Sequence, residues 1–143
     1  MTTEENKAVL FRYMEAVNNH TLDELDSLIA ANFIDHSGLP SLQSGLEGFK
    51  QAHMILEGAF PDVNFTVGEV MAEGDKVVVI ATGRGTNKGS FFGIPPTGKE
   101  VRWLGIRCLR IVDGKLVEAW SQFDQLGILQ QLGVIPPTGQ TGG

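Results

Sequence analysis

The spacing of apolar residues changes once along the chain, near residue 64, and no other feature constrains the fold as much. Before that point apolar residues recur three and four positions apart, as in residues 9–17, which is the spacing of one face of an α-helix. From residue 64 onwards they alternate with other residues, as in residues 65–72, which is the spacing of a β-strand. The chain should therefore place its helices first and its sheet afterwards.

Capping-box patterns indicate where the early helices begin. Such patterns open at Thr2, Thr21 and Ser44, each followed three positions later by a glutamate. We expect the first helix to end at residue 18, a short helix to follow Thr21, and a third helix to cover residues 46–59. A short strand is expected over residues 32–36.

The rest of the chain predicts strands joined by turns. Long strands are expected over residues 101–112 and 115–124, joined at Asp113 and Gly114, a pair typical of tight hairpins. Residues 89–99 should form a loop at the rim of a pocket. A final short helix is expected over residues 126–132, and residues 136–143 are expected to be a disordered tail.

This order of elements predicts one α+β domain over residues 1–135. To bury their apolar faces, the three N-terminal helices need a curved antiparallel sheet wrapped around them. That arrangement leaves a deep pocket between the helices and the sheet.

Charge and cysteine content exclude several classes of protein. Eleven lysines and arginines stand against 17 aspartates and glutamates, for a formal net charge of −6 at pH 7. Non-specific binding to nucleic acid or to an anionic membrane would need a surplus of positive charge. Cys108 is the only cysteine, so no intrachain disulfide can form. Because the chain starts with polar, acidic residues and lacks an apolar run of the ~20 residues that span a membrane, we expect a soluble cytoplasmic domain.

The turn at Asp113 and Gly114 predicts which residues of the hairpin face each other. Pairing begins at Val112 with Lys115 and continues one residue at a time, so that Arg107 lies opposite Trp120. One face of the hairpin then gathers Trp103, Arg107, Trp120, Gln122 and Asp124. Apolar walls with a few polar groups are typical of a ligand pocket, and a solvated face is the alternative.

The opposite face of the same hairpin is mainly apolar. In the expected register it carries Leu104, Ile106, Cys108 and Phe123. An apolar outer sheet face needs a cover, and a second copy packed sheet on sheet would provide it. We therefore expect a homodimer through this face.

Six short motifs occur in order along residues 4–135. They are FIDH (33–36), GLEGF (45–49), AFPD (59–62), AEGD (72–75), FFGIPPTG (91–98) and DGKLVEAW (113–120), the last followed by Asp124. In this order and spacing they resemble the SnoaL-like polyketide cyclases, or ester cyclases, of the nuclear-transport-factor-2-like superfamily. The resemblance implies a cone-shaped α+β fold with a deep pocket, usually assembled as a homodimer.

The same resemblance implies an activity and a base. Characterised members close a polyketide ring by an intramolecular aldol reaction without metal or cofactor, and their acid/base is an aspartate late in the last long strand, which matches Asp124. They also use a histidine on the preceding strand, where this chain offers Arg107 or Arg110 instead. Many relatives have a histidine where this chain has Ala119.

The candidate site residues each have a structural alternative. Asp124 could be the catalytic base or a helix N-cap. Arg107 could stabilise an enolate or form a cation–π pair with Trp120. The expected substrate-binding residues are Tyr13, His36, His53, Phe60, Phe92, Trp103, Trp120 and Gln122. Tyr13 and His53 could instead be satisfied core residues.

Adjacent strand residues point to opposite faces, so Asp35 and His36 cannot act as a simple dyad. Three dispersed histidines and one cysteine form no recognisable metal motif, and no nucleotide-binding loop appears. The polar cluster on one hairpin face, together with what the family resemblance implies, leads us to expect a cofactor-free acid/base enzyme, cyclase- or isomerase-like, that acts on a small hydrophobic carbonyl compound. A hydrolase or dehydratase using the same pocket, and a non-catalytic binding protein, are the alternatives.

Overall fold

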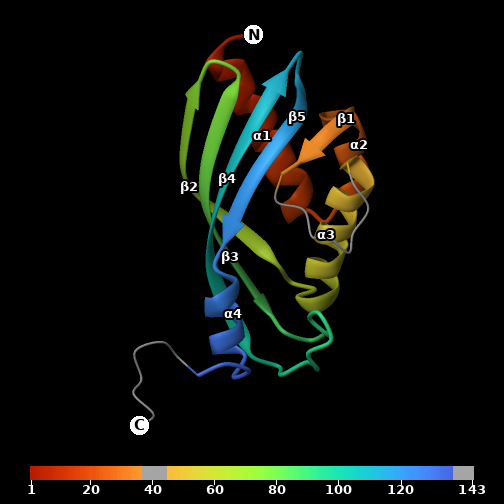
Figure 1. Cartoon of the computed structure of the whole chain (residues 1–143), viewed down its shortest axis with the longest axis vertical. Coiled ribbons are helices and arrows are strands. Elements are labelled where there is room, and N and C mark those ends of the chain that lie inside the picture. Colours follow the sequence, from red (N-terminus) through yellow and green to blue (C-terminus); the bar gives the residue numbers. More distant parts are fainter. Residues whose placement is uncertain (37–44, 137–143) are drawn as a thin grey trace.

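The computed structural model describes residues 1–36 and 45–136. Its helices are α1 (Thr3–Asn18), the 3-10 turn η1 (Leu22–Glu24), α2 (Leu25–Leu28), α3 (Gly45–Ala59) and α4 (Gln125–Gln131). Its strands are β1 (Ile29–Asp35), β2 (Asn64–Glu73), β3 (Lys76–Thr86), β4 (Glu100–Val112) and β5 (Lys115–Phe123). The expected order of helices followed by a sheet is confirmed (Figure 1).

All strands of the described residues belong to one five-stranded sheet, in the order β1-β5-β4-β3-β2. Strands β2 to β5 form the expected antiparallel meander. Strand β1 adds a parallel edge next to β5, which the sequence did not predict. In Figure 1 the long strands run side by side along the molecule, α3 lies beside β1, and α4 continues from the end of β5.

Of the three capping boxes predicted at helix starts, one forms, one is absent and one lies outside the described residues. Thr2 and Glu5 form the expected reciprocal capping box of α1. The box predicted at Thr21 is absent, because the Thr21 side chain makes no capping hydrogen bond and the chain forms the short η1 there. The box predicted at Ser44 and the tail over residues 137–143 lie outside the described residues.

A β-bulge changes the register of the β4–β5 hairpin. Near the turn, Ile111 pairs with Leu116 as predicted, but the register shifts between Arg110 and Ile111. Beyond the bulge Arg107 pairs with Ser121, and Trp120 pairs with Cys108. One extra residue on β5 moves every later side chain of that strand to the other face. The predicted pairing of Arg107 with Trp120 was therefore wrong.

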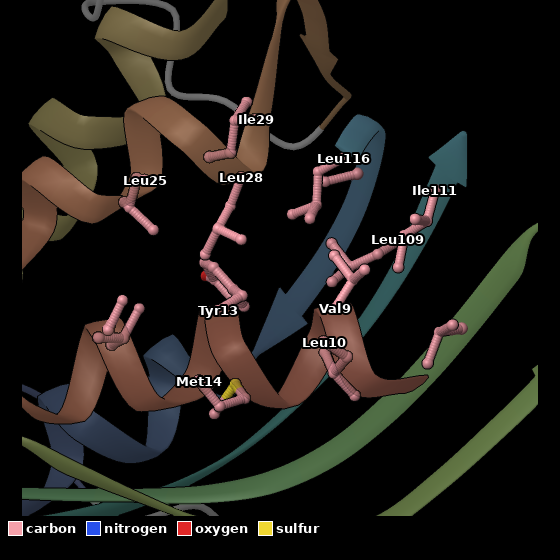
Figure 2. Close-up of a cluster of buried hydrophobic side chains, with 14 of the residues drawn as sticks. Val9, Leu10, Tyr13, Met14, Leu25, Leu28, Ile29, Leu109, Ile111 and Leu116 are labelled. Atoms are coloured by element: carbon pink, nitrogen blue, oxygen red, sulfur yellow. The ribbon is translucent and has the colours of Figure 1, made fainter. Parts of the chain in front are cut away.

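The main core lies between α1 and the sheet. Figure 2 shows Val9 and Tyr13 on the side of α1 that faces Leu28, Leu109 and Leu116. All five side chains are buried. This packing fixes α1 against β4 and β5, and so fixes Tyr13 relative to the strands that carry the polar groups discussed below.

A second buried cluster lies towards the opposite end of the strands. Phe60 and Trp103 are at its centre, with ring centroids 5.4 Å apart. Trp103 lies flat against Gly83 on β3, where a Cβ atom would be only 2.5 Å from the indole ring. A glycine at this position therefore makes room for the tryptophan.

No helix within residues 1–36 and 45–136 is long and apolar enough to cross a membrane.

Candidate active site

A cavity of about 180 Å³ lies between the helices and the sheet. Its walls are mainly apolar and come from α1, α3, strands β2 to β5 and the loop after β3. Its polar lining residues are Tyr13, Asp35, His53, Arg107, Ser121, Gln122 and Gln125. A mostly apolar space with a few convergent polar groups is typical of a small-molecule site.

The exposed lining residues show where the cavity opens. Phe92, Phe123 and Gln125 line it and are exposed to solvent. Phe123 is the last residue of β5 and Gln125 is the first residue of α4. Ile106, at the middle of β4, pairs with Gln122; both border the cavity, but alternation turns their side chains to the outer face of the sheet. Phe92 comes from the loop after β3, which agrees with the expected position of that loop at the rim.

Three of the predicted residues meet at the inner wall of the cavity. The Tyr13 hydroxyl lies 2.9 Å from Nε2 of His53, and Nδ1 of His53 lies 2.9 Å from the carbonyl oxygen of Phe49. Nη1 of Arg107 donates a hydrogen bond to the Tyr13 hydroxyl. The guanidinium also lies 5.7 Å from the ring centroid of Tyr13 and 5.3 Å from that of Phe49. The cation–π partners of Arg107 are therefore these two rings and not Trp120.

Burial sets the protonation states of His53 and Tyr13. Loss of hydration, with a further contribution from the charge of Arg107, lowers the pKa of His53 to about 4. Burial also raises the pKa of Tyr13, an effect that Arg107 opposes and Asp35 reinforces. At neutral pH the imidazole is therefore uncharged and the phenol retains its proton.

Asp35 is the carboxylate that lines the cavity. It is the last residue of β1 and pairs with Ala119 of β5. Strand alternation sends the next side chain, His36, the other way, as the sequence predicted. The sequence analysis expected His36 to line the cavity, but of the two adjacent residues it is Asp35 that faces inwards.

Aromatic side chains form much of the cavity wall. Trp103 lines it and is only 4% exposed, because it also packs against Phe60 and Phe65. Phe92 lines the rim, with 52% of its surface exposed and a backbone φ of 46°. A positive φ is strained for a bulky residue, so the loop holds the backbone of Phe92 in an uncommon conformation.

Three predicted substrate-binding residues lie outside the cavity lining. Phe60 is fully buried in the cluster behind Trp103. The bulge in β5 turns Trp120 to the outer face, where its ring stacks on His36 with centroids 4.7 Å apart. His36 also pairs with Glu118 at 2.7 Å. The cavity contacts predicted for these residues were therefore wrong.

Asp124 lies at the rim, between the lining residues Phe123 and Gln125, but is not part of the lining itself. It is exposed, and its carboxylate accepts a hydrogen bond of 2.8 Å from the backbone N–H of Gly127. This geometry is that of the N-cap of α4, the structural alternative considered above. Because of the bulge, the inward-facing polar side chain near the end of β5 is Ser121.

Phe123 also changes its place. The sequence put it on the apolar outer face, whereas the shifted register puts it among the cavity-lining residues. Gln122 also borders the cavity, but the shifted register pairs it with Ile106 and turns its side chain to the outer face, away from Trp103 and Arg107, where it was predicted.

Within residues 1–36 and 45–136, no group of three or more His, Cys, Asp or Glu side chains is arranged to hold a metal ion.

Comparison with known proteins identifies relatives along nearly the whole chain. Aklanonic acid methyl ester cyclase DnrD of Streptomyces peucetius is 30% identical over 131 residues, which cover 89% of this chain and 90% of DnrD. The solved structure of AclR, a proposed hydroxylase of Streptomyces galilaeus, is 29% identical with a TM-score of 0.87, and the match covers 97% of this chain and 87% of AclR. IdmH, a proposed polyketide cyclase of Streptomyces antibioticus, is also 29% identical, with a TM-score of 0.80 over 90% of this chain and 99% of IdmH.

The resemblance that the six motifs indicated is confirmed by a match over residues 7–132. The curved sheet packed against helices is shared with the solved relatives. The chain belongs to the SnoaL-like polyketide cyclase family.

Proposed function

We propose that the protein closes a ring in a polyketide-like carbonyl compound by cofactor-free acid–base chemistry. The observation that carries this proposal is the Arg107 guanidinium, which is hydrogen-bonded to Tyr13 at the wall of an apolar cavity. A cation fixed in such a place stabilises a developing oxyanion far more than it would in water. The family supplies the reaction class, and the cavity supplies the groups that could perform it.

The reaction is an intramolecular aldol addition. A base removes a proton from a carbon next to a carbonyl group, and the enolate oxygen that develops is bound by Arg107. The enolate carbon then attacks a second carbonyl carbon of the same molecule, forming one C–C bond, and the resulting alkoxide takes up a proton. Substrate and product are isomers, so the step needs no oxidant or reductant.

We assign the base to Asp35 and not to Asp124. A general base must come within hydrogen-bonding distance of the proton that it removes. Asp35 lines the cavity together with Arg107, whereas the Asp124 carboxylate accepts the N–H of Gly127 at the rim. Asp35 therefore takes the role for which the family resemblance suggested Asp124.

The apolar walls favour a largely flat, hydrophobic substrate. The rings of Phe49, Phe92 and Trp103 all contribute to the lining, and aromatic faces pack well against planar rings. The relative DnrD is named for aklanonic acid methyl ester. This ester is therefore the first substrate to test.

The test is incubation of the protein with aklanonic acid methyl ester, followed by chromatography, mass spectrometry and NMR of the product. Ring closure leaves the mass unchanged and shifts the retention time. Hydrolysis adds the mass of one water, dehydration removes it, and a binding protein returns the compound unaltered. Each of the last three outcomes would replace the cyclase proposal by one of its alternatives.

Variants then test the assigned roles. Arg107→Met should lower kcat about 10²–10³-fold, as loss of an oxyanion donor does, and Asp35→Asn about 10²–10⁴-fold, as loss of a general base does. Arg102→Met is the matched control, because Arg102 is on the same strand but exposed and paired with Glu100. If Arg107→Met were as active as this control, the assigned role of Arg107 would be refuted.

We also propose that two copies pair through the outer face of the sheet. In the shifted register this face exposes Leu104 and Ile106, which are 53% and 46% accessible, beside the half-buried Cys108. Leu104→Glu should give monomers by light scattering, whereas Met54→Glu on the exposed side of α3 should not change the mass. An unchanged mass for Leu104→Glu would count against this interface.

A further inference from the structure

Tyr13, His53 and Arg107 come from three different elements but form one continuous chain of hydrogen bonds. Tyr13 is on α1, His53 on α3 and Arg107 on β4. The tyrosine hydroxyl is the central atom, since it contacts both Nη1 of Arg107 and Nε2 of His53. The chain ends at the carbonyl oxygen of Phe49, one turn earlier in α3.

The chemistry of these groups fixes the direction of every hydrogen bond. A carbonyl oxygen only accepts, so Nδ1 of His53 carries the proton. The imidazole is neutral at pH 7, so its Nε2 is an acceptor and receives the Tyr13 proton. The phenol oxygen then has a free lone pair for Arg107. Donation therefore runs in one direction, from Arg107 through Tyr13 and His53 to the backbone of α3.

We propose that Tyr13 and His53 are positioning residues that hold the guanidinium of Arg107 in the cavity; this proposal rests on the proposed function. Arginine has a long, flexible side chain, and fixing it costs conformational entropy that the neighbouring groups must offset. The ring faces of Tyr13 and Phe49 restrict the guanidinium, and the hydrogen bond to the phenol aims it. The planar guanidinium has five N–H donors, so binding Tyr13 through Nη1 still leaves donors that can bind a substrate oxygen.

A neutral His53 is essential to this arrangement. A protonated imidazole would offer a donor to Tyr13 in place of an acceptor, reversing the central hydrogen bond, and would add a second cation near Arg107. Asp35 on β1 is the acidic group whose charge acts on Tyr13. The low pKa of His53 therefore agrees with the geometry of the chain.

The first test needs no substrate, so it remains decisive even if the proposed function fails. Nitrogen NMR of the His53 ring should show the Nδ1-protonated form at neutral pH in the wild type and in Arg102→Met. Arg107→Met should raise the pKa of His53 above about 4, because the nearby positive charge is removed. An Nε2-protonated ring, or the same titration in Arg107→Met and Arg102→Met, would overturn the proposal.

The second test is kinetic and uses aklanonic acid methyl ester. His53→Phe should lower kcat about 10–100-fold with a smaller change in KM, as loss of a supporting group does. His53→Gln, whose side-chain oxygen can accept from Tyr13, should recover most of that loss. His20→Gln, at a histidine outside the cavity lining that bonds the Val63 carbonyl, should have wild-type kinetics.

The order of the hydrogen bonds gives a third, stricter expectation. Tyr13→Phe should lower kcat as much as His53→Phe, and the double variant no further, because both residues act on the same guanidinium. Additive losses in the double variant would overturn the proposal. So would a His53→Gln variant as impaired as His53→Phe, since a merely structural role of His53 would not be rescued by a hydrogen-bond acceptor.

Discussion

Replacing Gly83 by alanine should disturb the wall of the cavity through a single added methyl group. A Cβ atom at this position would lie 2.5 to 2.7 Å from Cε2, Cζ2 and Nε1 of Trp103. These distances are far below van der Waals contact, so either the indole ring or strand β3 must move. Gly83 is paired with Trp103 inside the β3–β4 ladder, with further pairs on both sides, which restrains the backbone. The ring is therefore expected to move, although its buried contacts with Phe60 and Phe65 oppose this.

Overpacking of this kind typically costs about 1–3 kcal/mol. A chain of 143 residues has an unfolding entropy of about 0.3 kcal/mol/K, so the melting midpoint should fall by about 3–10 °C. Gly58→Ala on α3 is the control, because its Cβ would meet nothing within 4 Å. This control should leave the midpoint unchanged or raise it by up to about 3 °C, since alanine favours a helix over glycine.

A double-mutant cycle with Trp103→Leu separates this clash from a general effect on the strand. In the Trp103→Leu background, Gly83→Ala should cost almost nothing, because the ring that blocks the methyl group is gone. Both midpoints can be measured by calorimetry or circular dichroism. An unchanged midpoint for Gly83→Ala alone would refute the reasoning, as would the same loss with and without the tryptophan.

The remaining predictions concern three titratable or capping groups. The folded state protonates His53 only near pH 4, whereas the unfolded chain does so near the ordinary value of 6.5, so the unfolded state holds more protons between these values. Stability should therefore fall by about 3 kcal/mol as the pH drops from 7 towards 4, and urea titrations of His53→Gln should show that much less dependence. Asp124→Ala should lose about 1 kcal/mol from the cap of α4 and keep the kcat of the wild type; a loss of turnover as large as in Asp35→Asn would return the base to Asp124. Burial raises the pKa of Glu57, so Glu57→Gln should raise the melting midpoint at pH 7 more than at pH 4, and an equal effect at both pH values would contradict this.

Much of the fold could be predicted because its signals are local. The capping box at Thr2, the spacing of apolar residues in α1 and the turn at Asp113 and Gly114 each depend on a few neighbouring residues. The parallel edge strand β1 could not be found this way. Its pairing with β5 joins residues more than 80 positions apart, and a short strand carries no local sign of its partner.

The candidate site was predicted in part, for the same physical reason. Tyr13 and His53 follow from helical spacing, and Trp103 and Arg107 follow from alternation along β4, which contains no bulge among them. The positions on β5 depend on a bulge for which the sequence holds no local sign, because Val117 fits an ordinary strand. Every β5 side chain beyond it was consequently assigned to the wrong face.

The bulge also explains how the polar groups of this region are divided. It brings Ala119 to the inner face, where it pairs with Asp35 and packs in the main core, and turns Glu118 outwards beside His36 and Arg110. The inner face of the sheet thus keeps Asp35 and Arg107 in one apolar space. On the outer face, Glu118 forms ion pairs with His36 and Arg110 at the surface. If the same residues paired regularly, without the bulge, Glu118 would lie opposite Leu109 and turn inwards, to the side of the sheet that holds Asp35. A second carboxylate there would raise the pKa of one of the two and compete for Arg107. The bulge therefore keeps the Glu118 carboxylate on the other side of the sheet from Asp35, which favours the proposed role of Asp35 as a base.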